Sequence, residues 1–128
     1  MAKTLAQKFF IKPDQTLRLI AAPSAFTPLL SDLPAGVSLH ESGAGPFDQV
    51  HAFCITQAEL EERLPLAKTQ IKPTGLIWLA YPKGSSKNYQ AEINRDTIWE
   101  YALTIGLAPN HQIAIDEDWS SLRFKFVE

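Results

Sequence analysis

The sequence lacks several features that would define a function at once. It contains one cysteine, Cys54, so no internal disulfide can form, and this favours a reducing compartment. Twelve basic residues stand against 14 acidic ones, a net charge of −2, so no overall positive charge attracts nucleic acid or anionic membranes. No apolar run is long enough for a secretory signal or a membrane span. We therefore expect a soluble cytoplasmic protein without nucleic-acid or membrane partners.

Glycine is also scarce, and none stands where a nucleotide-binding fold needs it. The segment after the first expected strand reads AAPSAF (21–26), without the glycines that let a backbone approach a dinucleotide or S-adenosylmethionine. The segment KGSSKN (83–88) has one glycine and not the spacing of a P-loop. These absences favour a protein that is not an enzyme and that carries no cofactor.

The sequence does contain an alternation of helical and strand patterns across a single domain, residues 1–128. Helices are expected at residues 3–10, 23–33, 57–70 and 94–106, and strands at 16–22, 37–41, 49–56, 75–81, 111–116 and 121–127. This order predicts a three-layer α/β fold with a mostly parallel, Rossmann-like sheet and a C-terminal antiparallel hairpin.

Local signals mark where two of the helices begin and end. Thr56 or Gln57 stands at the expected start of the 57–70 helix, and Pro65 is expected to bend or shorten it. Asn94 is a good N-cap for the last helix, and Gly106 is a good residue to end it.

The ends of three strands provide candidate ligand-binding residues. Ligands of open parallel sheets bind beyond the carboxyl ends of the strands, and three such ends are expected to meet here. The loop after the fourth strand adds lysines and hydroxyls, and an arginine follows at a helix start, so these groups could hold an anion. The alternative is a solvated, mobile loop. The candidates are Pro23, Ser24, Thr56, Lys83, Ser85, Ser86, Lys87 and Arg95.

Other reactive side chains have simpler explanations. His51 and Cys54 are three apart on an expected strand, so they point to opposite faces and cannot share a metal ion. We expect Cys54 to be a buried core thiol, and Trp99 and Trp119 to be packing groups. No set of serine, histidine and acid can be placed together, so we assign no catalytic residue and no metal ligand.

An acidic cluster occupies the last turn. Asp116, Glu117 and Asp118 supply too few ligands for a hard cation, and a polar hairpin turn explains them. One of the two aspartates is expected to pair with Arg123.

Five segments in a fixed order resemble a small bacterial family whose function is not established. They cover nearly the whole chain and read KPDQTLRLIAAPSAF, QAELEERLP, LIWLAYPKGSSK, RDTIWEYALTIGLAP and IDEDWSSLRFKF. The expected strand order and terminal hairpin are also similar to a trimmed class I methyltransferase core. That resemblance implies a glycine-rich turn after the first strand, from which AAPSAF departs, and an acid ending the second strand, a place that Glu41 takes.

Three functions are compatible with these features. The first is a non-catalytic binding or regulatory module, derived from a methyltransferase-like ancestor, that recognises a small anionic ligand or a protein partner. The second is an enzyme that uses S-adenosylmethionine or a nucleotide through an unusual turn after the first strand. The third is an interaction protein that acts through its surface. The missing glycine turn favours the first.

Overall fold

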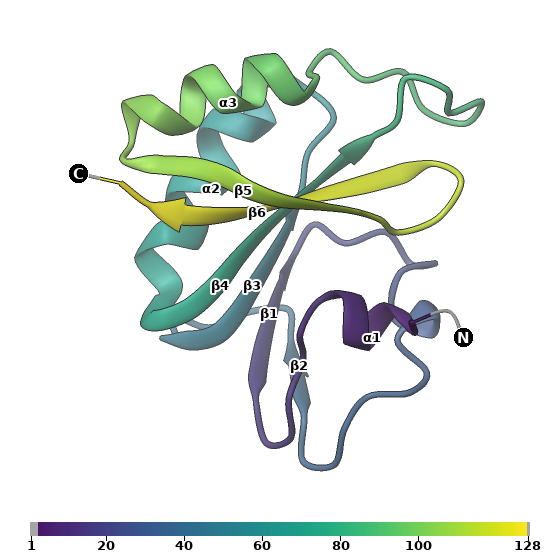
Figure 1. Cartoon of the computed structure of the whole chain (residues 1–128), viewed down its shortest axis with the longest axis vertical. Helices are drawn as coiled ribbons and strands as arrows, with labels where there is room; N and C mark the ends of the chain where they lie inside the picture. The colour runs from purple at the N-terminus through teal and green to yellow at the C-terminus, as the bar shows by residue number, and fades with distance from the viewer. Residues whose placement is uncertain (1–2, 128) are drawn as a thin grey trace.

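The computed structural model describes residues 3–127, which form a six-stranded sheet flanked by helical segments (Figure 1). Within these residues, no helix combines the length and apolar character that a membrane span requires. The elements in chain order are α1 (Leu5–Lys8), β1 (Thr16–Ile20), the 3₁₀ helix η1 (Thr27–Leu29), β2 (Ser38–His40), β3 (Phe47–Phe53), α2 (Gln57–Gln70), β4 (Ile71–Pro82), α3 (Arg95–Thr104), β5 (Leu107–Ala114) and β6 (Trp119–Phe126).

The sheet has the strand order β2-β1-β3-β4-β6-β5. The first four of these strands are parallel, and β6 pairs antiparallel with both β4 and β5. This confirms the predicted α/β fold with a mostly parallel, Rossmann-like sheet and a C-terminal antiparallel hairpin. The chain moves outward from β1 to β2 and then returns to the other side of β1 as β3, so the strand order reverses between β1 and β3.

The two long helices begin with capping boxes. The hydroxyl of Thr56 accepts a hydrogen bond from the backbone N–H of Glu59, while the Glu59 carboxylate accepts one from the Thr56 N–H. Asn94 makes the equivalent exchange with Thr97, as expected for an N-cap. Pro65 is predicted to bend or shorten its helix. The prediction of a shorter helix is wrong, because α2 continues past Pro65 to Gln70.

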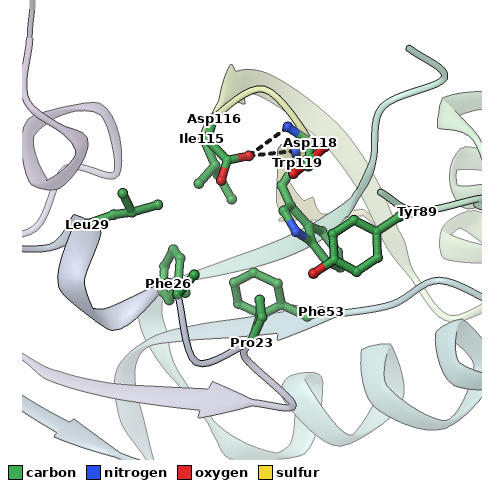
Figure 2. Close-up of a pocket in the computed structure, with 10 residues that line it drawn as sticks. Pro23, Phe26, Leu29, Phe53, Tyr89, Ile115, Asp116, Asp118 and Trp119 are labelled. Atoms are coloured by element: carbon green, nitrogen blue, oxygen red, sulfur yellow. Dashed lines mark hydrogen bonds between the residues drawn. The ribbon is translucent and has the colours of Figure 1, made fainter. Parts of the chain in front are cut away.

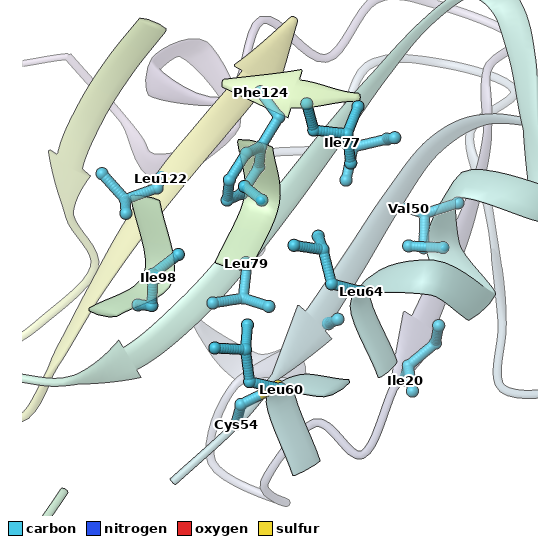
Figure 3. Packing of buried hydrophobic residues seen from close by; sticks show 14 of the residues in the cluster. Ile20, Val50, Cys54, Leu60, Leu64, Ile77, Leu79, Ile98, Leu122 and Phe124 are labelled. Atoms are coloured by element: carbon cyan, nitrogen blue, oxygen red, sulfur yellow. The ribbon is translucent and has the colours of Figure 1, made fainter. Parts of the chain in front are cut away.

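Separate apolar clusters cover the two faces of the sheet. Helices α2 and α3 pack on one face, where side chains of β3, β4 and β6 meet both helices (Figure 3). Cys54 is fully buried in this cluster, as predicted, and burial raises the pKa of its thiol to about 12. The opposite face is covered by α1 and η1, with Phe9, Phe26 and Trp78 among its buried rings.

The segment between β1 and β2 departs from the prediction. The sequence predicts a helix at residues 23–33, but only η1 forms there. Pro28, in the middle of this segment, lacks a backbone N–H donor, so a regular helix over residues 23–33 would lose a hydrogen bond and meet a ring clash there. The segment instead crosses the sheet face as an irregular strap, with Phe26 and Leu30 buried beneath it.

His51 lies on the strap side of the sheet and Cys54 on the helical side, as their spacing predicts. His51 is 2% exposed, and its Nε2 lies 2.8 Å from Oε1 of Gln49. Gln49 in turn donates to the carbonyl of Phe9, so the pair ties β3 to the end of α1. Burial lowers the pKa of His51 to about 3, so the ring is neutral at physiological pH.

Candidate functional site

The carboxyl ends of β1, β3 and β4 lie at one edge of the sheet, because these three strands are parallel neighbours. Pro23, Thr56 and Lys83, which follow these strands, therefore share one border of the molecule, as the sequence predicts. The reversal of strand order between β1 and β3 falls at the same edge. Doubly wound sheets bind their ligands at such a reversal point.

Two adjoining pockets open at this reversal point. They share Pro23, Phe53, Tyr89 and Trp119. The empty space within them, including the part open to solvent, is about 330 Å³ in one and 480 Å³ in the other. We refer to the two together as the aromatic pocket.

Aromatic rings from four separate segments form the walls of the aromatic pocket (Figure 2). Phe26 of the strap meets Phe53 of β3 edge to face, with ring centroids 4.8 Å apart. The Trp119 ring of β6 lies 5.3 Å from that of Phe53 and 5.0 Å from that of Tyr89, which belongs to the loop after β4. The negative ring faces of such a cluster attract cations, above all cations that carry apolar groups.

Two carboxylates stand at the rim of the aromatic pocket, in the turn between β5 and β6. Oδ1 of Asp116 accepts hydrogen bonds from the backbone N–H groups of Asp118 and Trp119, which fixes the turn beside the Trp119 ring (Figure 2). The expected pairing of an aspartate with Arg123 is wrong, because Arg123 donates to Asn110 instead. The Asp116 carboxylate is occupied by the backbone of its own turn, which explains why it does not reach along β6 to the arginine.

An ion pair closes the part of the aromatic pocket that lies against α2. Arg63 lies 3.3 Å from the Glu59 carboxylate and donates to the carbonyl of Phe53 at 2.7 Å. Backbone N–H groups of Ile55 and Thr56 also donate to Glu59, and these bonds lower the pKa of its carboxyl group. Both charges are therefore compensated within the protein, and this wall adds little net charge to the pocket.

The turn directly after β1 has an unusual backbone. Ala21 lines the aromatic pocket and has a φ of 59°, in the left-handed region. This conformation costs a non-glycine residue roughly 1–2 kcal/mol. Although AAPSAF contains no glycine, its backbone here takes a conformation that glycine adopts freely. The absence of glycine therefore does not exclude the turn geometry.

The predicted residues near the first strands take different places. Pro23 lines the aromatic pocket and Ser24 follows it as an exposed turn residue. Glu41 follows β2 and is exposed, and its backbone carbonyl accepts a hydrogen bond from Arg18. Thr56 uses its hydroxyl to cap α2. A ligand role for Ser24, Glu41 or Thr56 thus stays a prediction.

The predicted loop residues divide into two groups. Lys83 and Ser86 line a third hollow with Tyr81 and Asn94, and this hollow shares Tyr89 with the aromatic pocket. The Ser86 hydroxyl donates to Asp118 at 2.8 Å and accepts from the backbone of Asn88 and Tyr89. Its hydrogen bonds are thus made within the protein.

The other loop residues lie apart from that hollow. Ser85 and Lys87 lie beside Glu117 and Asp118 in a separate, acidic hollow. Arg95 begins α3 and lies over the ring of Trp99, 5.7 Å from its centroid. The structure therefore does not gather the predicted lysines, serines and arginine into one anion site.

Apart from Pro23, sequence reasoning missed the residues that build the aromatic pocket. The sequence predicts that Phe53 is a strand residue and Trp119 a packing group, and the structure confirms both. Tyr89 lies outside every helix and strand, so no periodic pattern could place it. The available signal is weak: an aromatic residue stands at the carboxyl end of β3 and another opens the strand that pairs with β4.

Comparisons with solved structures identify the class of this fold. A methyltransferase from Thiobacillus denitrificans, solved with S-adenosyl-L-homocysteine, matches with a TM-score of 0.60 at 7% identity, over 96% of this chain and 89% of that one. NodS, an N-methyltransferase from Bradyrhizobium japonicum, matches with a TM-score of 0.57 at 14% identity, over 98% of this chain and 90% of that one. A ribosomal protein methylase from Lactobacillus delbrueckii subsp. bulgaricus matches with a TM-score of 0.59 at 12% identity, over 95% of this chain and 74% of that one. The chain therefore has a Rossmann-like fold, similar to that of these class I S-adenosylmethionine-dependent methyltransferases.

Sequence comparisons give no further assignment. No protein-family model matches the chain, and no curated protein matches it. The resemblance to a small bacterial family therefore stays a prediction.

The prediction of a non-catalytic module is contradicted by the structural comparisons. The similar structures are methyltransferases, and the one from Thiobacillus denitrificans was solved with S-adenosyl-L-homocysteine. They favour the second function considered, an S-adenosylmethionine-binding enzyme. The missing glycines misled the prediction because the backbone after β1 reaches the left-handed conformation with alanine.

Proposed function

We propose that this protein binds S-adenosylmethionine in the aromatic pocket and catalyses methyl transfer. The observation that carries the proposal is the position of this pocket, at the point between β1 and β3 where the strand order reverses. The likeness in fold to methyltransferases supports it, and so does the left-handed turn at Ala21.

The lining of the aromatic pocket fits the chemistry of this cofactor. The rings of Phe53, Tyr89 and Trp119 would surround the positively charged sulfonium group, and two aspartates, Asp116 and Asp118, add negative charge at the rim. Apolar surface from the strap, at Phe26 and Leu29, suits the adenosyl part. In Rossmann-type sites an acid that follows the second strand binds the ribose hydroxyls, and here Glu41 follows β2.

S-adenosylmethionine supplies an electrophilic methyl group: a lone pair of the acceptor forms the new bond as the carbon–sulfur bond breaks, and that electron pair stays on sulfur. The residues of this chain bind and orient the reactants. The apolar walls also exclude water from the cationic centre, and exclusion of water strengthens the attraction between ring faces and positive charge.

Isothermal titration of the full chain with S-adenosylmethionine, S-adenosylhomocysteine and ATP tests the proposal. We expect saturable binding of the first two and none of ATP. Leu29, 40% exposed in the pocket wall, allows a test that spares the core: Leu29→Lys replaces apolar surface that suits the adenosyl part with a charge, and should weaken binding at least roughly tenfold.

Leu103→Lys is the matched control, since Leu103 is 52% exposed on α3, which packs on the opposite face of the sheet. It should bind as the wild type does. The absence of saturable heat with S-adenosylmethionine at millimolar concentration, from protein with a folded circular dichroism spectrum, would overturn the proposal.

A further inference from the structure

We propose that the hollow formed by the loop after β4 receives an anionic group, a carboxylate or a phosphate ester, of the methyl acceptor. The identification of the bound molecule as a methyl acceptor rests on the proposed function, although anion binding in the hollow can be tested without the cofactor. We refer to it as the loop hollow. Its empty space, including the part open to solvent, is about 730 Å³, and it is lined by residues 81–84, 86 and 89–94.

The position of the loop hollow is the first argument. Tyr89 lines both the loop hollow and the aromatic pocket, so the two spaces adjoin at this residue. A methyl donor and its acceptor must lie in adjoining sites, because the transferred carbon moves directly from one to the other. The loop hollow meets this requirement at the same edge of the sheet.

The charge of the loop hollow is the second argument. Among residues 3–127, Lys83 has no ion-pair partner. Its backbone N–H donates to the carbonyl of Asp118 at 2.7 Å, which anchors this lining residue of the hollow. The acid in the lining, Glu92, accepts a hydrogen bond from the backbone of Gln57 in the first turn of α2, where the helix dipole compensates its charge.

Tyr81 adds a neutral hydrogen-bond donor to the lining of the loop hollow. Tyr81 is 7% exposed, and its hydroxyl oxygen accepts a hydrogen bond from Gln112 at 3.4 Å, so the hydroxyl proton is free to be donated. Burial raises the pKa of Tyr81, and the nearby charge of Arg95 opposes this rise. At neutral pH the phenol of Tyr81 is therefore neutral, and the hollow is lined by a lysine and a tyrosine that can donate hydrogen bonds.

The two spaces have opposite chemistry. The aromatic pocket has ring faces with Asp116 and Asp118 at its rim, which suits a cation, whereas the loop hollow has a lysine that forms no ion pair within residues 3–127, which suits an anion. An acceptor with an anionic group would thus be held in the loop hollow and kept out of the cofactor space. Carboxylates and phosphates share this chemistry, and the experiment distinguishes them.

The test is an amide-resolved NMR titration of the full chain, without cofactor, using inorganic phosphate and acetate at constant ionic strength. We expect saturable shifts within residues 81–94 for at least one anion. A lower dissociation constant for phosphate would assign a phosphate ester, and a lower one for acetate a carboxylate. Lys83→Ala should weaken the binding roughly tenfold, the typical contribution of one charged hydrogen bond.

Lys87→Ala is the matched control, because Lys87 lies on the same loop in the separate acidic hollow. It should leave the dissociation constant within about twofold of the wild-type value, as expected when a neighbouring charge is screened. Equal weakening in both variants, or no saturable shift in residues 81–94, would overturn the anion site.

The calorimetric titration with S-adenosylmethionine separates this result from the proposed function. Lys83→Ala should bind the cofactor like the wild type. If the cofactor binds and neither anion does, the inference about the loop hollow fails and the proposed function stands. If an anion binds and the cofactor does not, the hollow is an anion site, and its role in methyl transfer is overturned.

Discussion

The hydroxyl of Tyr101 on α3 donates a hydrogen bond of 3.3 Å to the backbone carbonyl of Glu61 on α2. This is the carbonyl that Pro65, four residues later, cannot bond, because proline has no backbone N–H. A side chain from the neighbouring helix thus replaces the missing bond of α2. This contact helps to explain why the helix continues through Pro65 to Gln70.

Tyr101→Phe should therefore lower the free energy of unfolding by about 1 kcal/mol, the usual value of one hydrogen bond. The effect should shrink in a Pro65→Ala background, because the alanine introduced there would supply its own N–H to Glu61. Urea unfolding of the four proteins of this double-mutant cycle measures the coupling. Equal losses in both backgrounds would show that the Tyr101 bond does not compensate for Pro65.

Ala21→Gly should raise or preserve stability, unlike most alanine-to-glycine changes. The change relieves the left-handed strain at φ 59°, worth roughly 1–2 kcal/mol, and this offsets the greater freedom that glycine has in the unfolded chain. Ala25, an exposed turn residue of the same strap, is the control: Ala25→Gly should cost about 0.5–1 kcal/mol. Thermal unfolding of both variants measures the two changes in stability. Equal destabilisation would count against strain at residue 21.

Stability should fall below about pH 6.5 because of His51. Its pKa is about 3 in the folded protein and near 6.5 in the unfolded chain, so only the unfolded state takes up a proton between these values. The unfolded state is thereby stabilised as the pH falls. From pH 7.5 to 5.5 this group should remove about 1.4 kcal/mol, and the loss should continue toward pH 3.

His51→Gln keeps a donor for Gln49 and removes the titration, so its unfolding free energy should change less over this range, as urea unfolding at both pH values would reveal. His111, which is exposed, serves as the matched control in His111→Gln. A wild-type pH dependence in the His51 variant would show that another group is responsible.

Asp118 should control the order of the loop after β4. Its carboxylate accepts hydrogen bonds from Ser86 at 2.8 Å and from Asn88 at 3.1 Å. Asp118→Ala removes both acceptors, and we expect amide exchange at Ser86 to Tyr89 to accelerate at least roughly tenfold, as local opening becomes easier. Exchange in Glu117→Ala should match the wild type, since Glu117 is the exposed neighbour in the same turn. Unchanged exchange in the Asp118 variant would contradict this role.

The order of the elements and much of their detail could be predicted from local patterns in the sequence. Apolar periodicity placed most strands, and the N-caps Thr56 and Asn94 marked two helix starts, because these signals depend on neighbours within one turn. Alternation also separated His51 from Cys54 correctly, since side-chain direction on a strand is a local property. The common edge of the segments at residues 23, 56 and 83 followed from the parallel order of the strands.

Features that depend on distant partners could be recognised only in the folded chain. The aromatic pocket needs Phe53, Tyr89 and Trp119 from three separated segments, and their meeting depends on the path of an irregular loop that has no periodicity to read. Pro65 within α2 and the left-handed Ala21 both oppose local preference. Such conformations persist where contacts elsewhere in the molecule outweigh a local cost of a few kcal/mol, and no short stretch of sequence contains those contacts.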